Sequence, residues 1–119
     1  MKHELRVKRI YDESSDDDGF RILVDRLWPR GVSKEQARID LWPKELTPSN
    51  DLRKWFHADP TRHDEFVVRY TAELDEQRQS VAEIIDSIDA PVITLLTASK
   101  DVESGHVAVL IAFIEAHFK

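Results

Sequence analysis

Val92-Ile93-Thr94-Leu95-Leu96-Thr97 carries the strongest strand pattern in the chain, and the prediction of the fold starts from it. A polar loop from Ala98 to Gly105 follows it, and the apolar residues from His106 to Phe118 predict a helix. The order strand, loop, helix is typical of α/β proteins, in which helices cover a mainly parallel sheet.

Further strands are expected before this unit. Leu5 to Tyr11 alternates between apolar and basic residues, Phe20 to Asp25 is apolar and β-branched, and Ile39 to Trp42 is a shorter candidate ended by Pro43. The connection Asp12 to Gly19 is too short for a crossover helix, so the first two strands could form a hairpin instead of lying parallel.

Helix-start signals separate these strands from the last one. Ser33 with Gln36 resembles a capping box, and Thr47-Pro48-Ser49-Asn50 is typical of a helix N-terminus. Asp59-Pro60 predicts the start of a long helix to about Ile88, which the polar stretch Gln77 to Ser80 could break. We therefore predict one α/β domain over residues 1–119, with a mainly parallel sheet of about four strands covered by helices.

Composition excludes several classes of protein. The chain has no cysteine, which removes disulfides, thiolate metal sites and thiol nucleophiles. No apolar run is long enough to span a bilayer, and the polar N-terminus does not resemble a signal peptide, so we expect a cytoplasmic protein without membrane contact. Nothing in the sequence indicates an organic cofactor.

The net charge of −6 is unevenly distributed. The run Asp12 to Asp18 holds five of the 23 acidic residues and no basic one, which leaves 18 acidic against 17 basic residues elsewhere. We interpret this run as a solvated turn, rather than as a metal-binding loop, because it lacks the ligand spacing of an EF-hand. The nearly neutral remainder allows a local basic pocket, and binding of nucleic acid stays open.

The segment after the second expected strand is the first candidate site. Asp25, Arg26, Trp28 and Arg30 follow the end of a buried strand, where α/β folds place their ligands. Arginine binds phosphate or carboxylate through a bidentate fork, and Trp28 could supply a stacking face. The structural alternative is that Asp25 pairs with an arginine while Trp28 fills the core.

The loop after the last expected strand is the second candidate. Thr97, Ser99 and Lys100 could hold an anion with hydroxyl, backbone N–H and ammonium groups. His106, together with Asp25 or Asp101, could transfer protons. The structural alternative is that Ser99, Asp101 or Ser104 only caps the last helix.

A third cluster, His57, Asp59 and His63, could in principle bind a metal ion. Its spacing matches no zinc pattern and Asp59 is explained as a helix cap, so we predict no metal site. We interpret Trp55 and Phe56 as core residues, and Arg53-Lys54 as solvated or ion-paired.

The same segments resemble the short, YeaO-like branch of the domain of unknown function 488 family. The resemblance covers nearly the whole chain and rests on these residues: Leu23 to Gly31, Trp42-Pro43-Lys44-Glu45-Leu46 with Pro48-Ser49, Leu52-Arg53-Lys54-Trp55-Phe56, Phe66, Arg69-Tyr70, and Thr94 to Asp101 with His106. It implies a small α/β domain of bacterial type, and it assigns no biochemical activity.

This chain departs from the longer members of that family in its candidate site. Thr97 and Gly105 stand where those members have cysteines, and Val107 stands where they have an arginine, whereas His106 is retained. A thiol-based role in those members would therefore not transfer. A role that rests on Asp25, Arg26, Arg30, Lys100 and His106 would.

Three functions are compatible with these residues. The first is a binding module that holds an anionic metabolite or a nucleic-acid end in a cationic crevice. The second is a hydrolase or transferase of a phosphoester-like substrate, with His106 as acid or base. The third is an ion-paired core that supports a protein interface. The sequence assigns no substrate, pathway or oligomeric state.

Overall fold

Strand β3 (Val92–Thr97) is the centre of a three-stranded parallel sheet in the computed structural model, which describes residues 3–100 and 105–118. Strand β1 (Glu4–Arg9) pairs with one edge of β3, and strand β2 (Phe20–Leu23) pairs with the other. The expected α/β fold with a parallel sheet is therefore confirmed. The first two strands are not a hairpin, because β3 lies between them.

The sheet has three strands rather than the four expected. Residues Ile39 to Trp42 make one bridge, in which Leu41 lies opposite Ile22 of β2. The Leu23 N–H donates to the Leu41 carbonyl at 3.0 Å, and the Leu41 N–H donates to the Arg21 carbonyl at 3.2 Å. Pro43 follows, and proline cannot donate to a ladder, so the pairing does not extend into a strand.

The connection between β1 and β2 crosses over β3 in only ten residues, Ile10 to Gly19. It contains a short 3-10 helix, η1 (Asp16–Asp18), whose Asp18 carbonyl accepts a hydrogen bond from Thr94 Oγ1 of β3 at 2.6 Å. Gly19 has a φ of +64°, and a Cβ there would lie 2.3 Å from the Val92 carbonyl oxygen. Glycine is required because the chain passes so close to the start of β3.

The end of the acidic run is buried, so its interpretation as a solvated turn is wrong for Asp18. This residue is 6% exposed, and its carboxylate pairs with Arg21 and, at 3.1 Å, with Lys8. Burial raises the pKa of Asp18, but hydrogen bonds from the Ser15 N–H and from Lys8 outweigh burial and hold the pKa below its ordinary value. Asp12, Glu13, Asp16 and Asp17 are exposed, as expected.

The helices follow the expected signals closely. Ser33 and Gln36 form the capping box of α1 (Lys34–Ala37), Ser49 caps α2 (Asn50–Ala58), and Asp59 caps the 3-10 helix η3 (Pro60–Arg62). The long helix is broken at Gln77 into α3 (His63–Glu76) and α4 (Arg78–Ser87). The remaining elements are the 3-10 helix η2 (Lys44–Leu46) and the last helix α5 (His106–Phe118). No helix of the described part is both long and apolar enough to cross a membrane.

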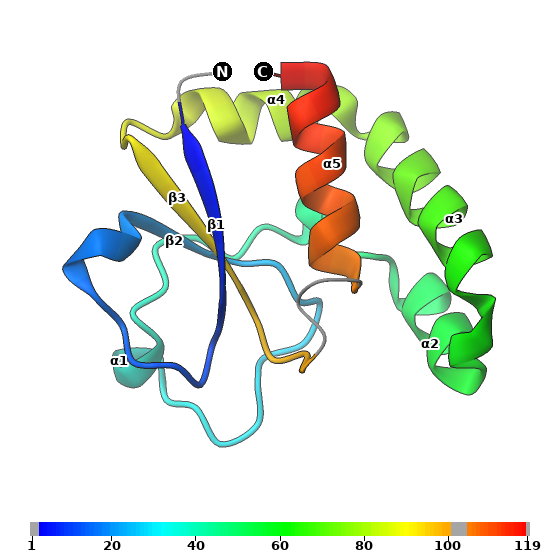
Figure 1. Cartoon of the computed structure of the whole chain (residues 1–119), viewed down its shortest axis with the longest axis horizontal. Helices are drawn as coiled ribbons and strands as arrows, with labels where there is room; N and C mark the ends of the chain where they lie inside the picture. Colours follow the sequence, from blue (N-terminus) through cyan, green and yellow to red (C-terminus); the bar gives the residue numbers. More distant parts are fainter. Residues whose placement is uncertain (1–2, 101–104, 119) are drawn as a thin grey trace.

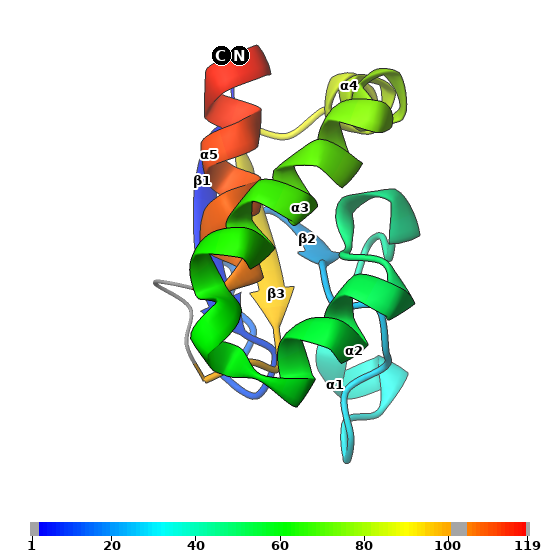
Figure 2. The ribbon, with the colours of Figure 1, turned by 90° about the vertical axis from the view of Figure 1, so that its right-hand side faces the viewer.

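The two faces of the sheet are covered differently. Helices α2, α3 and α5 lie on one side of the sheet, where Ile93 and Leu95 join Ile22 in the main core (Figure 1). On the other side lie η1 and α1, and Leu23 and Leu96 pack there in a smaller core. Figure 2 shows α2 and α3 on the outside of the helical layer. It also shows that β1 begins, and α5 ends, at the same end of the molecule. Irregular segments thus replace helices on the second face.

Replacing Asp18 by asparagine should destabilise the fold, because Arg21 would remain buried without its carboxylate partner. Loss of one partner of a buried ion pair costs about 3–5 kcal/mol. Urea denaturation should show this loss for Asp18→Asn. The matched control, Asp16→Asn in the exposed part of the same loop, should change stability by less than about 0.5 kcal/mol. Equal stability of the two variants would contradict the role given to Asp18.

Candidate functional site at the carboxyl ends of the strands

The carboxyl ends of β2 and β3 and the first turn of α5 meet at one edge of the sheet. Val24 continues from β2 and its N–H donates to the Leu96 carbonyl of β3 at 3.0 Å, so Asp25 leaves the sheet beside Thr97. His106 is the first residue of α5, and its ring reaches the same place. Parallel strands bring such side chains together because their carboxyl ends lie at the same edge.

The Asp25 carboxylate is the centre of this cluster. Its Oδ1 accepts hydrogen bonds from Thr97 Oγ1 at 2.7 Å and from His106 Nε2 at 2.9 Å, and its Oδ2 accepts from the Ala98 N–H at 2.8 Å. Burial raises the pKa of Asp25, but the hydrogen bonds from His106, Ala98 and Thr97 outweigh burial and lower it below its ordinary value. Asp25 is therefore ionised at neutral pH and orients its neighbours.

The surroundings of His106 determine its tautomer. Nε2 lies 2.9 Å from Asp25 Oδ1 and 3.2 Å from the Val24 carbonyl oxygen, and both atoms are acceptors. Nε2 must therefore carry the hydrogen, which leaves the lone pair of the neutral ring on Nδ1. Nδ1 makes no hydrogen bond with the described residues, so this atom can accept a proton or contact a ligand.

Thr97 is committed to the same arrangement. It is 0% exposed, its hydroxyl donates to Asp25, and its Oγ1 accepts the Ser99 N–H at 3.1 Å. Arg9, at the end of β1, fixes the loop from the other side by donating to the carbonyls of Ala98 and Ser99 at 3.0 and 3.2 Å. The hydroxyl is thus a structural donor, and it is buried too completely to attack a substrate.

Two aromatic residues that the sequence analysis did not assign to the site also border it. The ring of Tyr70 in α3 lies 6.4 Å from the His106 ring, and its hydroxyl donates to the Leu46 carbonyl. Burial, followed by the charges of Glu73 and Asp25, raises the pKa of Tyr70 well above its ordinary value. Trp42 Nε1 donates to the Asp25 carbonyl at 2.7 Å. Tyr70 follows the helical pattern of core residues and is among the residues that resemble the family, but neither signal placed it beside His106.

Two arginines lie beside the start of α2. Arg26 Nε donates to the Pro48 carbonyl at 3.2 Å, next to the cap residue Ser49. The backbone N–H of Arg53 donates to the Ser49 carbonyl at 2.9 Å, and its side-chain Nε is buried with no hydrogen-bond partner among the described residues. Arg53 makes no ion pair with the described residues, and apart from this buried Nε the side chain belongs to a residue that is only half-buried. Only the contacts of the folded chain could show this, because a lone arginine in a helix carries no such signal.

The other candidate residues lie apart from the Asp25 cluster. Trp28 donates from Nε1 to the Val32 carbonyl at 2.7 Å and packs against the smaller core. Arg30 and Lys100 are exposed, and neither side chain makes an ion pair or hydrogen bond with the described residues. Asp101 lies outside the described residues. The structure therefore brings together Asp25, Thr97 and His106, with Arg26 nearby, and it does not place Trp28, Arg30 or Lys100 among them.

The third cluster is explained by helix capping and ion pairing. Asp59 Oδ1 accepts the Thr61 N–H at 3.1 Å, and Oδ2 lies 3.5 Å from Arg62 Nε. In residues 3–100 and 105–118, no three histidine, aspartate or glutamate side chains gather into a group that could hold a metal ion.

Comparison with known proteins assigns the chain to a family. A sequence model described as the inactive DUF488-N3 subclade matches residues 4–119. The chain belongs to this family. It is 42% identical over 106 residues to the uncharacterised protein YeaO of Escherichia coli (strain K12), which covers 89% of this chain and 92% of YeaO. It is also 42% identical to the uncharacterised protein Rv3073c of Mycobacterium tuberculosis (strain ATCC 25618 / H37Rv), with 89% of each chain covered. No solved structure matches the chain.

Membership of the DUF488-N3i family confirms the resemblance found in the sequence, including its YeaO-like character. The relatives are of bacterial origin, and each match covers 89% of this chain, so most of the domain is shared. Their names assign no substrate or reaction. The chemistry of the site must therefore be argued from the residues themselves.

Replacing Asp25 by asparagine should loosen the site and lower stability by about 2–4 kcal/mol. In asparagine an NH2 group replaces one of the two carboxylate oxygens, and NH2 cannot accept a hydrogen bond. Depending on how the amide is oriented, either the Ala98 N–H or the His106 Nε2–H therefore loses its acceptor. The conservative control Thr97→Ser keeps the hydroxyl donor and should cost less. Thermal or urea denaturation at pH 7 measures both effects, and a stable Asp25→Asn variant would contradict the central position of Asp25.

The pH dependence of stability should carry the signature of the same carboxylate. Because the pKa of Asp25 is lower in the folded than in the unfolded chain, its contribution is present above the unfolded pKa of about 3.9. It is lost as the pH falls through the lower, folded value. The wild-type protein should therefore lose stability more steeply than Asp25→Asn below about pH 4. Parallel curves would contradict the lowered pKa.

Proposed function

We propose that this domain is a cytoplasmic binding module for a small anion that bears a phosphate or carboxylate group. The ligand would bind at the carboxyl ends of β2 and β3, between the Asp25–His106 pair and the start of α2. The proposal involves binding without turnover.

One observation carries the proposal. Six described basic residues are buried or half-buried, and three of them, Lys8, Arg21 and Arg62, pair with aspartates. The other three have no carboxylate partner among the described residues: Arg9 and Arg26, whose hydrogen bonds lie at the site, and Arg53, which lies in α2. Removing a cation from water without a counter-ion is costly, so the half-buried Arg9 and Arg26 at this edge favour an anion as the missing partner.

The arginines differ in what they still offer. Arg9 already donates to two carbonyls, so it contributes charge more than hydrogen bonds. Arg26 uses only Nε, and its two Nη groups are left to donate. Arg53 has its buried Nε unsatisfied. A phosphate or carboxylate group could accept from the two Nη groups of Arg26, while Nδ1 of His106 would add a donor once protonated.

The family supports binding rather than catalysis. The matching family is described as an inactive subclade, and Thr97 replaces the cysteine of longer relatives with a hydroxyl that is buried and committed to Asp25. The absence of cysteine from the whole chain agrees with this. These points favour a site that has kept its charges and lost its nucleophile.

A second function remains favoured by one observation, the Asp25–His106 pair. A carboxylate that orients a histidine through one ring nitrogen leaves the other free to move a proton. In that alternative the protein is a hydrolase or transferase of a phosphoester-like substrate, with Nδ1 of His106 as acid or base. The two functions differ in whether His106 supports turnover.

Inorganic phosphate and citrate are suitable probes of the proposed binding. Titration of 15N-labelled protein should shift the His106 ring and the Ala98 and Ser99 amides saturably, and added salt should weaken the effect. Arg26→Gln should weaken binding about tenfold, because it removes a charge-assisted contact. The control Arg78→Gln, on the exposed face of α4, should leave binding unchanged. Absence of saturable shifts, or equal binding by Arg26→Gln, would contradict the proposal.

A panel of phosphoesters distinguishes the alternative. The binding proposal expects no turnover by the wild-type protein. Turnover that disappears in His106→Ala would overturn it in favour of the enzymatic function, whereas turnover that survives His106→Ala would refute the catalytic role of His106.

A further inference from the structure

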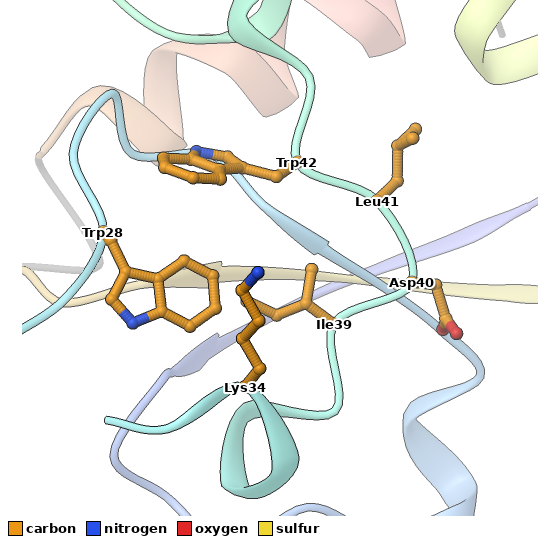
Figure 3. A pocket seen from close by; sticks show the side chains of 6 residues that line it. All are labelled: Trp28, Lys34, Ile39, Asp40, Leu41 and Trp42. Carbon is orange, nitrogen blue, oxygen red and sulfur yellow. The ribbon is translucent and has the colours of Figure 1, made fainter.

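A separate cavity lies beside the smaller core, against which its lining residues Trp28 and Ile39 pack. Its volume is about 210 Å³ (Figure 3). Six residues line it: Trp28, Lys34, Ile39, Asp40, Leu41 and Trp42. Trp42 also borders the Asp25, Thr97 and His106 cluster through its bond to the Asp25 carbonyl, whereas the other five lining residues do not belong to that cluster.

Two indole rings form an aromatic corner in this cavity. The rings of Trp28 and Trp42 are 5.4 Å apart and meet edge to face at 66°. Each indole N–H is already bonded to a backbone carbonyl, of Val32 and of Asp25, at 2.7 Å. These bonds fix the orientation of both rings. Trp42 is 37% exposed, which is unusual for so large an apolar side chain.

The two charged residues that line the cavity are directed differently. Figure 3 shows the Lys34 amino group directed toward the two rings, while the Asp40 carboxylate points away from them. Asp40 is occupied elsewhere, since its Oδ2 accepts the Arg21 N–H at 2.9 Å. Lys34 makes no ion pair with the described residues. An aromatic corner with an unpaired ammonium selects a flat ligand that carries negative charge and disfavours a cation.

The flanking sequence strengthens this preference. Residues 26–44 hold five basic and two acidic residues, in a protein whose net charge is −6. Besides Lys34, the basic ones are Arg26, Arg30, Arg38 and Lys44. Tryptophans interleaved with basic residues are the pattern by which proteins stack bases and contact phosphates. A cavity of about 210 Å³ is small for a dinucleotide and suits one planar ring whose phosphate stays at the rim.

We propose that the Trp28–Trp42 cavity binds one nucleotide unit, with its base stacked on the indole rings and its phosphate held by Lys34. The unit could be a free mononucleotide or one nucleotide of a single strand, since both present the same base and phosphate. This site does not depend on the anion site proposed at Arg26 and His106.

The three tryptophans of the chain provide a direct readout. Trp28 and Trp42 line the cavity, whereas Trp55 lies on α2 between Arg62 and Arg69, with centroid distances of 4.9 and 4.4 Å. Each contributes one indole N–H signal to a 1H–15N spectrum. Addition of uridine 5′-monophosphate should shift the Trp28 and Trp42 signals saturably and leave the Trp55 signal in place. Shifts confined to Trp55, or no shifts, would overturn the proposal.

Variants test each part of the site. Trp42→Ala should weaken binding roughly tenfold, the range expected for loss of base stacking. Lys34→Gln, at an exposed position, should weaken binding roughly threefold to tenfold without affecting folding. Its matched control is Lys54→Gln, an exposed and unpaired lysine of α2, which should bind like wild type. Unchanged binding by Lys34→Gln would contradict the assigned phosphate contact.

Two further probes separate the sources of the ligand and the two sites. Uridine without phosphate should bind more weakly than the monophosphate, and equal binding would contradict the role of Lys34. A deoxythymidine hexamer that binds much more tightly than the monophosphate supports a single strand as the source, and equal binding per site supports a free nucleotide. His106→Ala should leave the Trp28 and Trp42 shifts intact, so failure of the anion site and failure of this cavity are distinguishable.

Discussion

The Asp25 carboxylate holds together the part of the protein in which its function is expected. Three donors from different segments converge on it: the Thr97 hydroxyl at the end of β3, the Ala98 N–H in the following loop, and Nε2 of His106 in α5. A half-buried carboxylate is stabilised when its lone pairs accept hydrogen bonds, and Asp25 accepts three. The same bonds that stabilise the charge also fix the loop between β3 and α5 and orient the imidazole.

The buried Asp18 carboxylate likewise holds neighbouring segments together, on the side of the sheet that carries η1 and α1. Asp18 pairs with Arg21 and Lys8, and its carbonyl accepts from Thr94 of β3, so a ten-residue loop can perform the crossover for which parallel strands ordinarily use a helix. Asp18 thus lies over one face of the sheet, whereas Asp25 lies at the edge where β2 and β3 end. In both places ionic and polar contacts, rather than packed helices, hold the loops against the sheet.

Local patterns in the sequence predicted the elements well and the unpaired charges poorly. The run from Val92 to Thr97 and the cap at Ser49 each carry a local signal, and the structure follows them. The burial of Asp18 and the unsatisfied Nε of Arg53 depend on contacts between distant segments. Neither residue differs from its exposed neighbours in hydropathy or spacing, so no pattern along the chain could reveal them. The ending of the expected fourth strand at Pro43 was visible, but its reduction to one bridge was not.

The central claim, that Asp25 fixes one tautomer of His106 and leaves Nδ1 available, is open to a single measurement. Long-range 1H–15N correlation spectra of the imidazole distinguish a ring nitrogen that carries hydrogen from one that does not. For the neutral ring of the free protein, we predict that Nε2 carries the hydrogen and that Nδ1 does not. This preference for the Nε2–H tautomer should be lost in Asp25→Ala. A neutral ring with its hydrogen on Nδ1 would contradict the account.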